Sequence, residues 1–411
     1  MKNATEQLTA LRKVANHSYQ TIAWPVKKDE TWRRTPISLL EPESFTVATL
    51  VDNDEPTLGV LHQSYSAHVL IKDGHIQALT VSEAASSLGV KLLSLNKGIA
   101  EISWVVKDLE TRVSQISDRF EAWHFSHLGL GVAVEVPAKA ELENPIVIEI
   151  EENRPGVAIF PHIIVRLGAL STASVVVKYQ SPDGVSLFVG SGIDYQVEEG
   201  ANLQACEIQN LGNKSRHVDS STLHMARDTH VWHLNASFGA MVTRTQGIFS
   251  LEGPGSQLKT NGIYLGCDTQ HKDIRIVQNH EAPNTQSHAL YKGALRDSSR
   301  TVFQGLIEVK PGANKTDAYL TNRNLILADG AKADSLPQLR IDTNDVKCSH
   351  GSTTGKVNED EVFYLMARGF SRNEARLMIA EGLFAEIIDQ APVFLRMSLD
   401  STIVRLLGGH G

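Results

Sequence analysis

Residues 322–351, NRNLILADGAKADSLPQLRIDTNDVKCSHG, contain the pattern that decides the fold. Two short apolar runs are separated by a turn at Gly330 and Ala331, and an Asn- and Asp-rich turn follows them. Short apolar runs between such turns indicate β-strands. If the strand pattern continues to the end of the stretch, Cys348 and His350 point to the same face, because side chains alternate along a strand with a period of two.

The same pattern extends upstream to about residue 128. Gly-Ala turns recur at residues 168–169, 200–201 and 312–313, each shortly before another apolar run. The clearest runs are VAVEV at 132–136, IVIEI at 146–150, IIVRL at 163–167 and SVVVK at 174–178. Many short strands without intervening helices fit a sandwich, a barrel or a stacked β-solenoid. The solenoid fits best, because it can lengthen coil by coil. Thr316, Thr321, Asn322 and Asn324 suit ladders between coils.

Helical patterns dominate residues 1–127. Leu8, Leu11 and Val14 predict a helix over residues 5–20. A second stripe predicts one long amphipathic helix; it comprises Val106, Leu109, Val113, Ile116, Phe120 and Trp123. His124 and His127 follow it and are interpreted as structural residues, since no third ligand is nearby. In the motif ETWRRT at 30–35, Trp32 either anchors the N-terminal arm or belongs to a docking or anion-binding patch, and the anchor is favoured.

Residues 356–411 return to a helical pattern. Asn358 with Glu361, and Ser371 with Glu374, resemble capping boxes, and Pro392 suits the first turn of a third helix. This tail has more apolar positions than three helices can bury among themselves. Packing against the β-domain and docking of a partner explain the surplus equally well.

Composition excludes several classes of protein. The chain has 411 residues, 42% of them hydrophobic and 21% charged, with a net charge of −8; this is typical of a globular protein and argues against nucleic-acid binding. No apolar run approaches the ~18 residues needed to span a bilayer. The N-terminus lacks a signal-peptide pattern, and the cysteines are only three, so we expect a cytoplasmic protein with reduced thiols.

Few motifs carry chemistry. GSTTGKV at 351–357 has the wrong spacing for a phosphate-binding loop, and no dinucleotide fingerprint follows a strand. Cys348 and His350 remain, since thiolate and imidazole suit iron, iron–sulfur fragments, zinc or copper. Two ligands do not complete a tetrahedral site, so a metal here must be exchangeable or shared across an interface. The alternative is a buried Cys beside a surface His.

At this point the sequence resembles a known family. The shared motifs are ETWRRT at 30–35, VFQG at 302–305, KTDAY at 315–319, NRNLIL at 322–327, ADSLPQLRI at 333–341, DVKCSHGST at 345–353 and FYLMARG at 363–369. Together they closely resemble the SufB/SufD family of iron–sulfur cluster assembly proteins. The CSHG motif and the short length place the chain nearer to SufD than to SufB.

The resemblance implies a right-handed parallel β-helix over residues 128–355, flanked by helical domains at 1–127 and 356–411. It implies a non-catalytic scaffold that pairs with a SufB-like paralogue through the β-helix and binds a SufC-like ABC ATPase through its C-terminal helices. In isolation such a chain can form a homodimer. The residues expected in the ATPase-docking region are Phe363, Tyr364, Met366, Arg368, Gly369, Glu381 and Phe384.

The resemblance also makes His350 a candidate ligand at the SufB interface, with a less certain role for Cys348. The ligand would be a transient iron–sulfur cluster or iron shared with the partner. A reduced flavin is associated with such complexes, but no residue here identifies its site. Two alternatives remain open: a metal-dependent enzyme that uses Cys348 and His350, and a purely structural β-helix partner.

Overall fold

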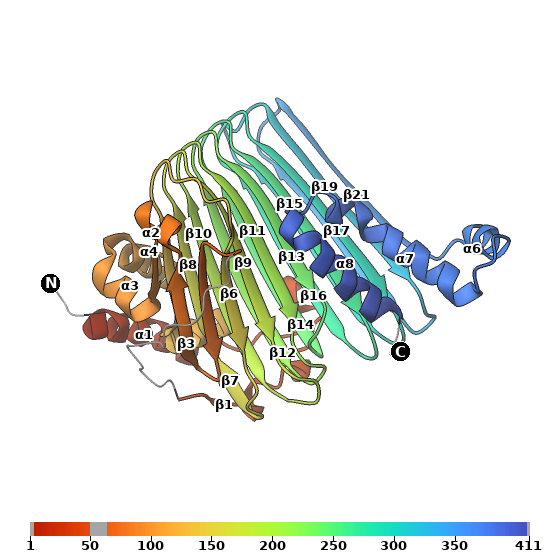
Figure 1. Ribbon diagram of the computed structural model, residues 1–411, viewed down its shortest axis with the longest axis horizontal. Helices are drawn as coiled ribbons and strands as arrows, with labels where there is room; N and C mark the ends of the chain where they lie inside the picture. Colours follow the sequence, from red (N-terminus) through yellow and green to blue (C-terminus); the bar gives the residue numbers. More distant parts are fainter. Residues whose placement is uncertain (1–3, 50–63, 409–411) are drawn as a thin grey trace.

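The computed structural model describes residues 4–49 and 64–408 (Figure 1). The chain is mainly β, with 44% of it in strands, and forms a β-solenoid of about eight turns with helices at both ends. This confirms the predicted fold class. Within the solenoid, successive strands alternate between two sheets, so each coil contributes one strand to each sheet.

The first sheet has the strand order β20-β18-β16-β14-β12-β10-β8-β5-β4, with β7 and β1 beside β10. Its strands are β1 (Thr46–Val47), β4 (Lys91–Ser94), β5 (Leu130–Val136), β7 (Val157–Ile159), β8 (Pro161–Leu167), β10 (Phe188–Val197), β12 (Arg216–Met225), β14 (Val242–Leu251), β16 (His271–His280), β18 (Arg300–Val309) and β20 (Lys332–Ile341). We call this sheet A.

The second sheet, sheet B, has the order β21-β19-β17-β15-β13-β11-β9-β6-β2-β3. Its strands are β2 (Ala67–Lys72), β3 (His75–Val81), β6 (Ile146–Glu151), β9 (Thr172–Gln180), β11 (Asn202–Asn210), β13 (His230–Ser237), β15 (Gln257–Gly266), β17 (Gln286–Leu295), β19 (Thr316–Ile326) and β21 (Val346–Lys356). Pairing in both sheets is parallel except at the N-terminal end, where β2 pairs with β3 and β4 with β5 in antiparallel fashion.

Unequal coil lengths explain why the sequence shows no strict repeat. The aligned residues Arg216, Val242, His271, Arg300 and Lys332 are separated by 26, 29, 29 and 32 residues. The corners absorb these differences. Gly200 and Gly312 adopt φ values of 67° and 86° there, which glycine reaches without steric cost. The alanines that follow them, Ala201 and Ala313, are fully buried.

The space between the two sheets, which we call the lumen, changes character along its length. The N-terminal coils fill it with Val, Ile and Leu side chains, such as Val132, Ile148 and Val175. Later coils add polar side chains that bond to one another. The Tyr264 hydroxyl donates to Asn324 at 2.6 Å, and Asn324 donates to Asn322 at 2.8 Å.

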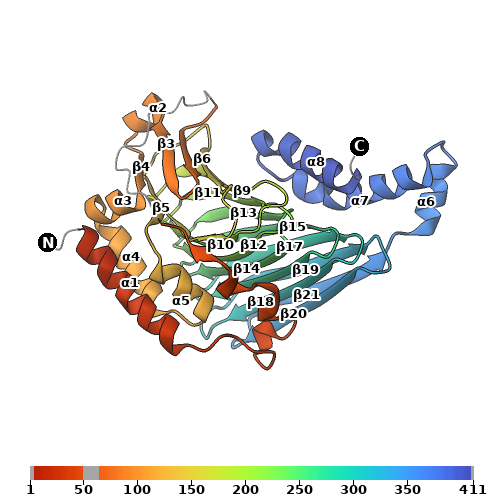
Figure 2. The ribbon, with the colours of Figure 1, turned by 90° about the horizontal axis from the view of Figure 1, so that it is seen from below.

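Four N-terminal helices cover the outer face of sheet A (Figure 2). They are α1 (Ala4–Thr21), α3 (Leu95–Glu101), α4 (Ser103–Ser114) and α5 (Arg119–Ser126). The short helix α2 (Glu83–Ser87) instead buries Ala85 in the core between the sheets. The prediction of one helix through Val106 and Trp123 is wrong. The Asp118 side chain accepts a hydrogen bond from the Glu121 amide at 2.9 Å and so begins a separate helix. The predicted apolar stripe is nevertheless mostly buried.

The N-terminal arm crosses the same outer face of sheet A in three short 3-10 turns, at Glu30–Trp32, Ile37–Leu39 and Pro42–Ser44. Trp32 is buried between the Arg244 guanidinium, 3.8 Å from its ring centroid, and the Phe120 ring. Thr35 donates to Asp273 at 2.6 Å. These contacts confirm that Trp32 anchors the arm.

The C-terminal helices are α6 (Glu359–Met366), α7 (Arg372–Ile388) and α8 (Val393–Gly408). A capping box of Ser371 and Glu374 begins α7, as predicted. Helices α7 and α8 lie against the outer face of sheet B and bury Phe384, Ile387 and Leu399 on β13, β15 and β17 (Figure 2). Within residues 4–49 and 64–408, no helix is both long and apolar enough to cross a membrane.

Candidate metal site and interaction surfaces

Cys348 and His350 lie on β21, the last strand of sheet B. In the register of the sheet, Cys348 is aligned with Ala318 and His350 with Leu320. Both of these β19 residues are buried core residues of the lumen. Cys348 and His350 therefore face the lumen side of the last coil, which confirms the prediction that they share a face. GSTTGKV at 351–357 continues this strand as far as Lys356 and forms no phosphate-binding loop.

The two side chains differ in their surroundings. Cys348 is half-buried and packs against the lumen core, whereas His350 is exposed. Burial, and next the Asp317 carboxylate, raise the pKa of the Cys348 thiol above its ordinary value. The thiol therefore stays protonated at neutral pH.

No three His, Cys, Asp or Glu side chains of the described residues lie close enough together to hold a metal ion. A metal at Cys348 and His350 would thus need further ligands from solvent or from another chain.

The last coil also has an open edge. β20 and β21 each have only one neighbouring strand within the described part of their sheets, so one side of each presents unpaired backbone N–H and C=O groups. Leu339 and Ile341 on β20 and Tyr319 on β19 are exposed nearby. An edge of ten- and eleven-residue strands with exposed apolar side chains suits pairing with a strand of another chain.

Helix α6 projects beyond the β-helix at the C-terminal end (Figure 1). Its inner face is anchored by Val362, which is buried against α7 and β19. Its outer face exposes Phe363 and Tyr364, with 73% and 56% of each residue accessible. The Arg368 guanidinium lies 4.5 Å over the Tyr364 ring and donates to its hydroxyl. Gly369 follows the end of α6 and has a φ of 99°. This left-handed conformation is common just after a helix ends.

The other residues expected in the docking region differ in their accessibility. Met366 is exposed beside Phe363 and Tyr364. Glu381 is only partly accessible, and burial followed by the Asp400 charge raises its pKa. Phe384 is fully buried on the face of α7 that packs against sheet B, so it attaches α7 to the solenoid and is not itself accessible to a partner. We call Phe363, Tyr364, Met366 and Arg368 the α6 patch.

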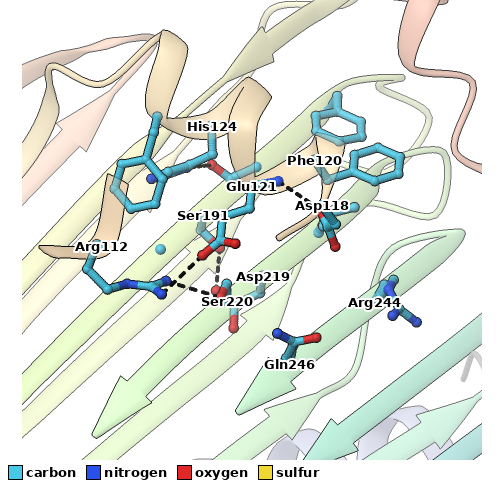
Figure 3. Close-up of a pocket in the computed structure, with 15 residues that line it drawn as sticks. Arg112, Asp118, Phe120, Glu121, His124, Ser191, Asp219, Ser220, Arg244 and Gln246 are labelled. Carbon is cyan, nitrogen blue, oxygen red and sulfur yellow. Dashed lines mark hydrogen bonds and ion pairs between the residues drawn. The ribbon is translucent and has the colours of Figure 1, made fainter. Parts of the chain in front are cut away.

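A pocket lies between α4, α5 and the outer face of sheet A (Figure 3). Gly190 and Gly192 line it, and their lack of side chains makes room for the Phe160 and His162 rings. The pocket encloses about 30 Å³, room for one or two water molecules. Arg112 reaches its wall and forms ion pairs at 3.0 Å with both Glu121 and Asp194. His162 adds a contact of 3.2 Å to Asp194.

His124 completes this network and is buried as a structural residue, as predicted. It lies 3.0 Å from His162 and 2.8 Å from the Gly190 carbonyl oxygen. Burial, and then His162, lower the pKa of His124 to about 3, so it is neutral at physiological pH. Arg112, by contrast, lowers the pKa of Asp194 against the effect of burial. Of this network, the sequence pattern draws attention only to His124, because its charged partners are far apart along the chain.

The fold and surfaces define a class of protein: a two-sheet β-solenoid with helical ends, an open terminal edge and a protruding helix. Residues 149–383 match the family described as "SUF system FeS cluster assembly, SufBD core domain". The match covers more than half of the chain, and the chain belongs to the SufBD family of iron–sulfur cluster assembly proteins.

Relatives extend the similarity over most of the chain. A SufBD family protein of Mycobacterium leprae is 28% identical over 94% of this chain and 92% of its own length. A SufBD family protein of Mycobacterium tuberculosis is 30% identical over 67% of this chain and 71% of its own length. The iron–sulfur cluster assembly protein SufD of Escherichia coli is 26% identical over 89% of this chain and 85% of its own length.

Proposed function

We propose that this chain is a non-catalytic scaffold subunit on which a nascent iron–sulfur cluster, or iron, is held by ligands from two subunits. The observation that carries the proposal is the position of Cys348 and His350, which share one face of the terminal strand beside an open edge. With no third ligand among the described residues, such a pair holds a cluster weakly enough to release it.

The proposal assigns the remaining surfaces to partners of the Suf system. The open edge of β20 and β21 pairs with a SufB-like subunit, which supplies the missing ligands next to His350. The α6 patch binds a SufC-like ATPase, and ATP-driven motion then comes from that subunit. The similarity to the SufD of Escherichia coli supports this assignment.

Replacing His350 with Ala should remove the more accessible ligand. In a complex co-expressed and purified anaerobically with SufB-like and SufC-like subunits, we expect bound iron and acid-labile sulfide to fall about tenfold or more. The matched control is His230→Ala, which removes an exposed histidine from β13 in the same sheet; it should leave the iron content unchanged.

Other outcomes identify the alternatives. Iron and sulfide that persist in a Cys348→Ser/His350→Ala double variant would contradict the role of this pair and leave a structural partner. Turnover by the isolated chain, lost in the same double variant, would indicate an enzyme instead.

A further inference from the structure

Two acidic side chains face each other inside the lumen, in the coils that follow its aliphatic N-terminal part. Glu207 on β11 and Asp219 on β12 are both 3% exposed. The Ser221 hydroxyl lies between them, 3.0 Å from Glu207 Oε2 and 3.3 Å from Asp219 Oδ2. One hydroxyl proton can be donated to only one of these oxygens. The other contact is a hydrogen bond only if that carboxyl group itself carries a proton.

The second oxygen of Asp219 is also in a short contact. It lies 2.5 Å from Ser191 Oγ, which is 2.8 Å from His217 Nε2. His217 cannot neutralise the acid pair, because burial, and next Lys272, lower its pKa to about 3. The side chains that act on Asp219 are Glu207, Ser191 and Ser221, none of which is a cation.

A comparison with Asp194 shows why charge pairing decides the outcome. Asp194 on β10 is as deeply buried as Asp219, but it faces outward and is paired with Arg112 and His162. Its pKa is lowered. Burial, and next the Glu207 charge, instead raise the pKa of Asp219 to about 8. When two carboxylates lie close together without an Arg or Lys partner, the charge of one raises the pKa of the other.

Other titratable groups surround the pair on every side. Tyr179 on β9 and Tyr195 on β10 lie close enough to interact with both carboxylates, and burial raises the pKa of each phenol, so both stay neutral and add no charge to the site. Lys272 on β16 donates to Ser237 and to the Gly239 carbonyl oxygen. His233 Nε2 on β13 lies 3.4 Å from Glu207 Oε1, farther from Glu207 than Ser221 Oγ is at 3.0 Å, and its Nδ1 lies 3.1 Å from Thr260 Oγ1.

We propose that Glu207 and Asp219 hold a single proton between them through Ser221, which makes the lumen of this solenoid a proton-binding site. The proton lies on Asp219, which donates to Ser221, and Ser221 donates to Glu207. The pair then carries one negative charge. Asp219 Oδ2, Ser221 Oγ and Glu207 Oε2 each have a hydrogen-bond partner in this chain of donors. Opening of these coils, or a second ionisation, is therefore coupled to release of a proton.

Infrared difference spectroscopy in H₂O and D₂O tests the site directly, because a protonated carboxyl has a carbonyl stretching band that a carboxylate lacks. At pH 6.5, where exposed acids are ionised, we expect the full-length protein to retain a band worth one carboxyl per chain, which shifts in D₂O. Asp219→Asn and Glu207→Gln should each abolish it, since either change leaves a single charged carboxylate. The control Glu199→Gln, at an exposed corner, should leave the band unchanged.

Three outcomes would overturn the proposal. A band that survives in Glu207→Gln would mean that burial alone protonates Asp219. If the wild type lacks the band, both carboxyl groups are ionised, and the proton instead makes His233 a cation that forms an ion pair with Glu207. Ser221→Ala keeps both carboxyls and removes only the bridge, so it serves if the other variants do not fold; a band of unchanged frequency in that variant would rule out the bridge.

The site also predicts how stability depends on pH. Because the pKa of Asp219 is raised from 3.8 to about 8 on folding, its contribution is fully present below about pH 4. This contribution to stability is lost as the pH rises through about 8, because Asp219 then ionises while it is still buried in the folded protein. We therefore expect the free energy of unfolding, measured in urea, to fall more steeply between pH 6 and 9 in the wild type than in Asp219→Asn.

Discussion

Replacing Arg112 with methionine is expected to lower the free energy of unfolding by about 3–5 kcal/mol, because it leaves buried charges without their partner. Arg112 is 8% exposed and is the cation between Glu121 on α5 and Asp194 on β10. Methionine keeps much of the apolar stem but cannot neutralise either carboxylate. Urea unfolding at pH 7, followed by circular dichroism, measures the loss.

Two comparisons separate charge from packing. The double variant Arg112→Met/Asp194→Asn removes one stranded charge and should recover a large part of the stability. Arg340→Met breaks an ion pair with Glu308 in which the arginine side chain is 65% exposed, so it should cost less than about 1 kcal/mol. A similar loss in Arg112→Met and Arg340→Met would show that burial of the network does not matter.

The same variants should respond to pH in a defined direction. The pKa of Asp194 is lowered in the folded protein, so its stabilisation is present above about pH 4 and is lost as the pH falls below that value. The difference between wild type and Arg112→Met should consequently shrink in acid.

The fold could be predicted because strand signals are local. Apolar runs between Gly-Ala turns mark the coils, and the period of two placed Cys348 and His350 on one face without knowledge of their neighbours. The break between α4 and α5 was missed because the apolar stripe continues across it, although Asp118 is a recognisable helix cap.

Contacts between coils could not be predicted. They depend on which residues are aligned in neighbouring strands, and this alignment cannot be read from the sequence because the coils differ in length. Ser191 and Asp219 meet only because Ser191 is aligned with Asp219 across β10 and β12. The helical tail shows the same limit. Phe363 and Phe384 are the same residue type in helices of similar character, yet one is 73% exposed and the other fully buried. Tertiary packing alone decides which of them can meet a partner.

Replacing Phe363 with glutamate, together with Tyr364→Ala, should weaken binding of the proposed ATPase subunit by about 100-fold or more. Exposed aromatic side chains that become buried in an interface commonly contribute about 2–4 kcal/mol each, and a new charge opposes burial. The fold should be unaffected, because both side chains are exposed and α6 is anchored separately by Val362. Isothermal titration calorimetry with the isolated ATPase subunit measures the change.

This variant is sharper than deletion of residues 358–411, which would uncover the apolar face of sheet B beneath α7 and α8 and confuse lost binding with aggregation. The matched control is Met397→Glu, which places a charge on α8 at a side chain that is also highly exposed, with 83% of the residue accessible. Normal affinity in Met397→Glu and lost affinity in the α6 variant would place the ATPase on α6. The reverse result would move the docking surface to α8, because both variants keep the packing that attaches the helical tail to the solenoid.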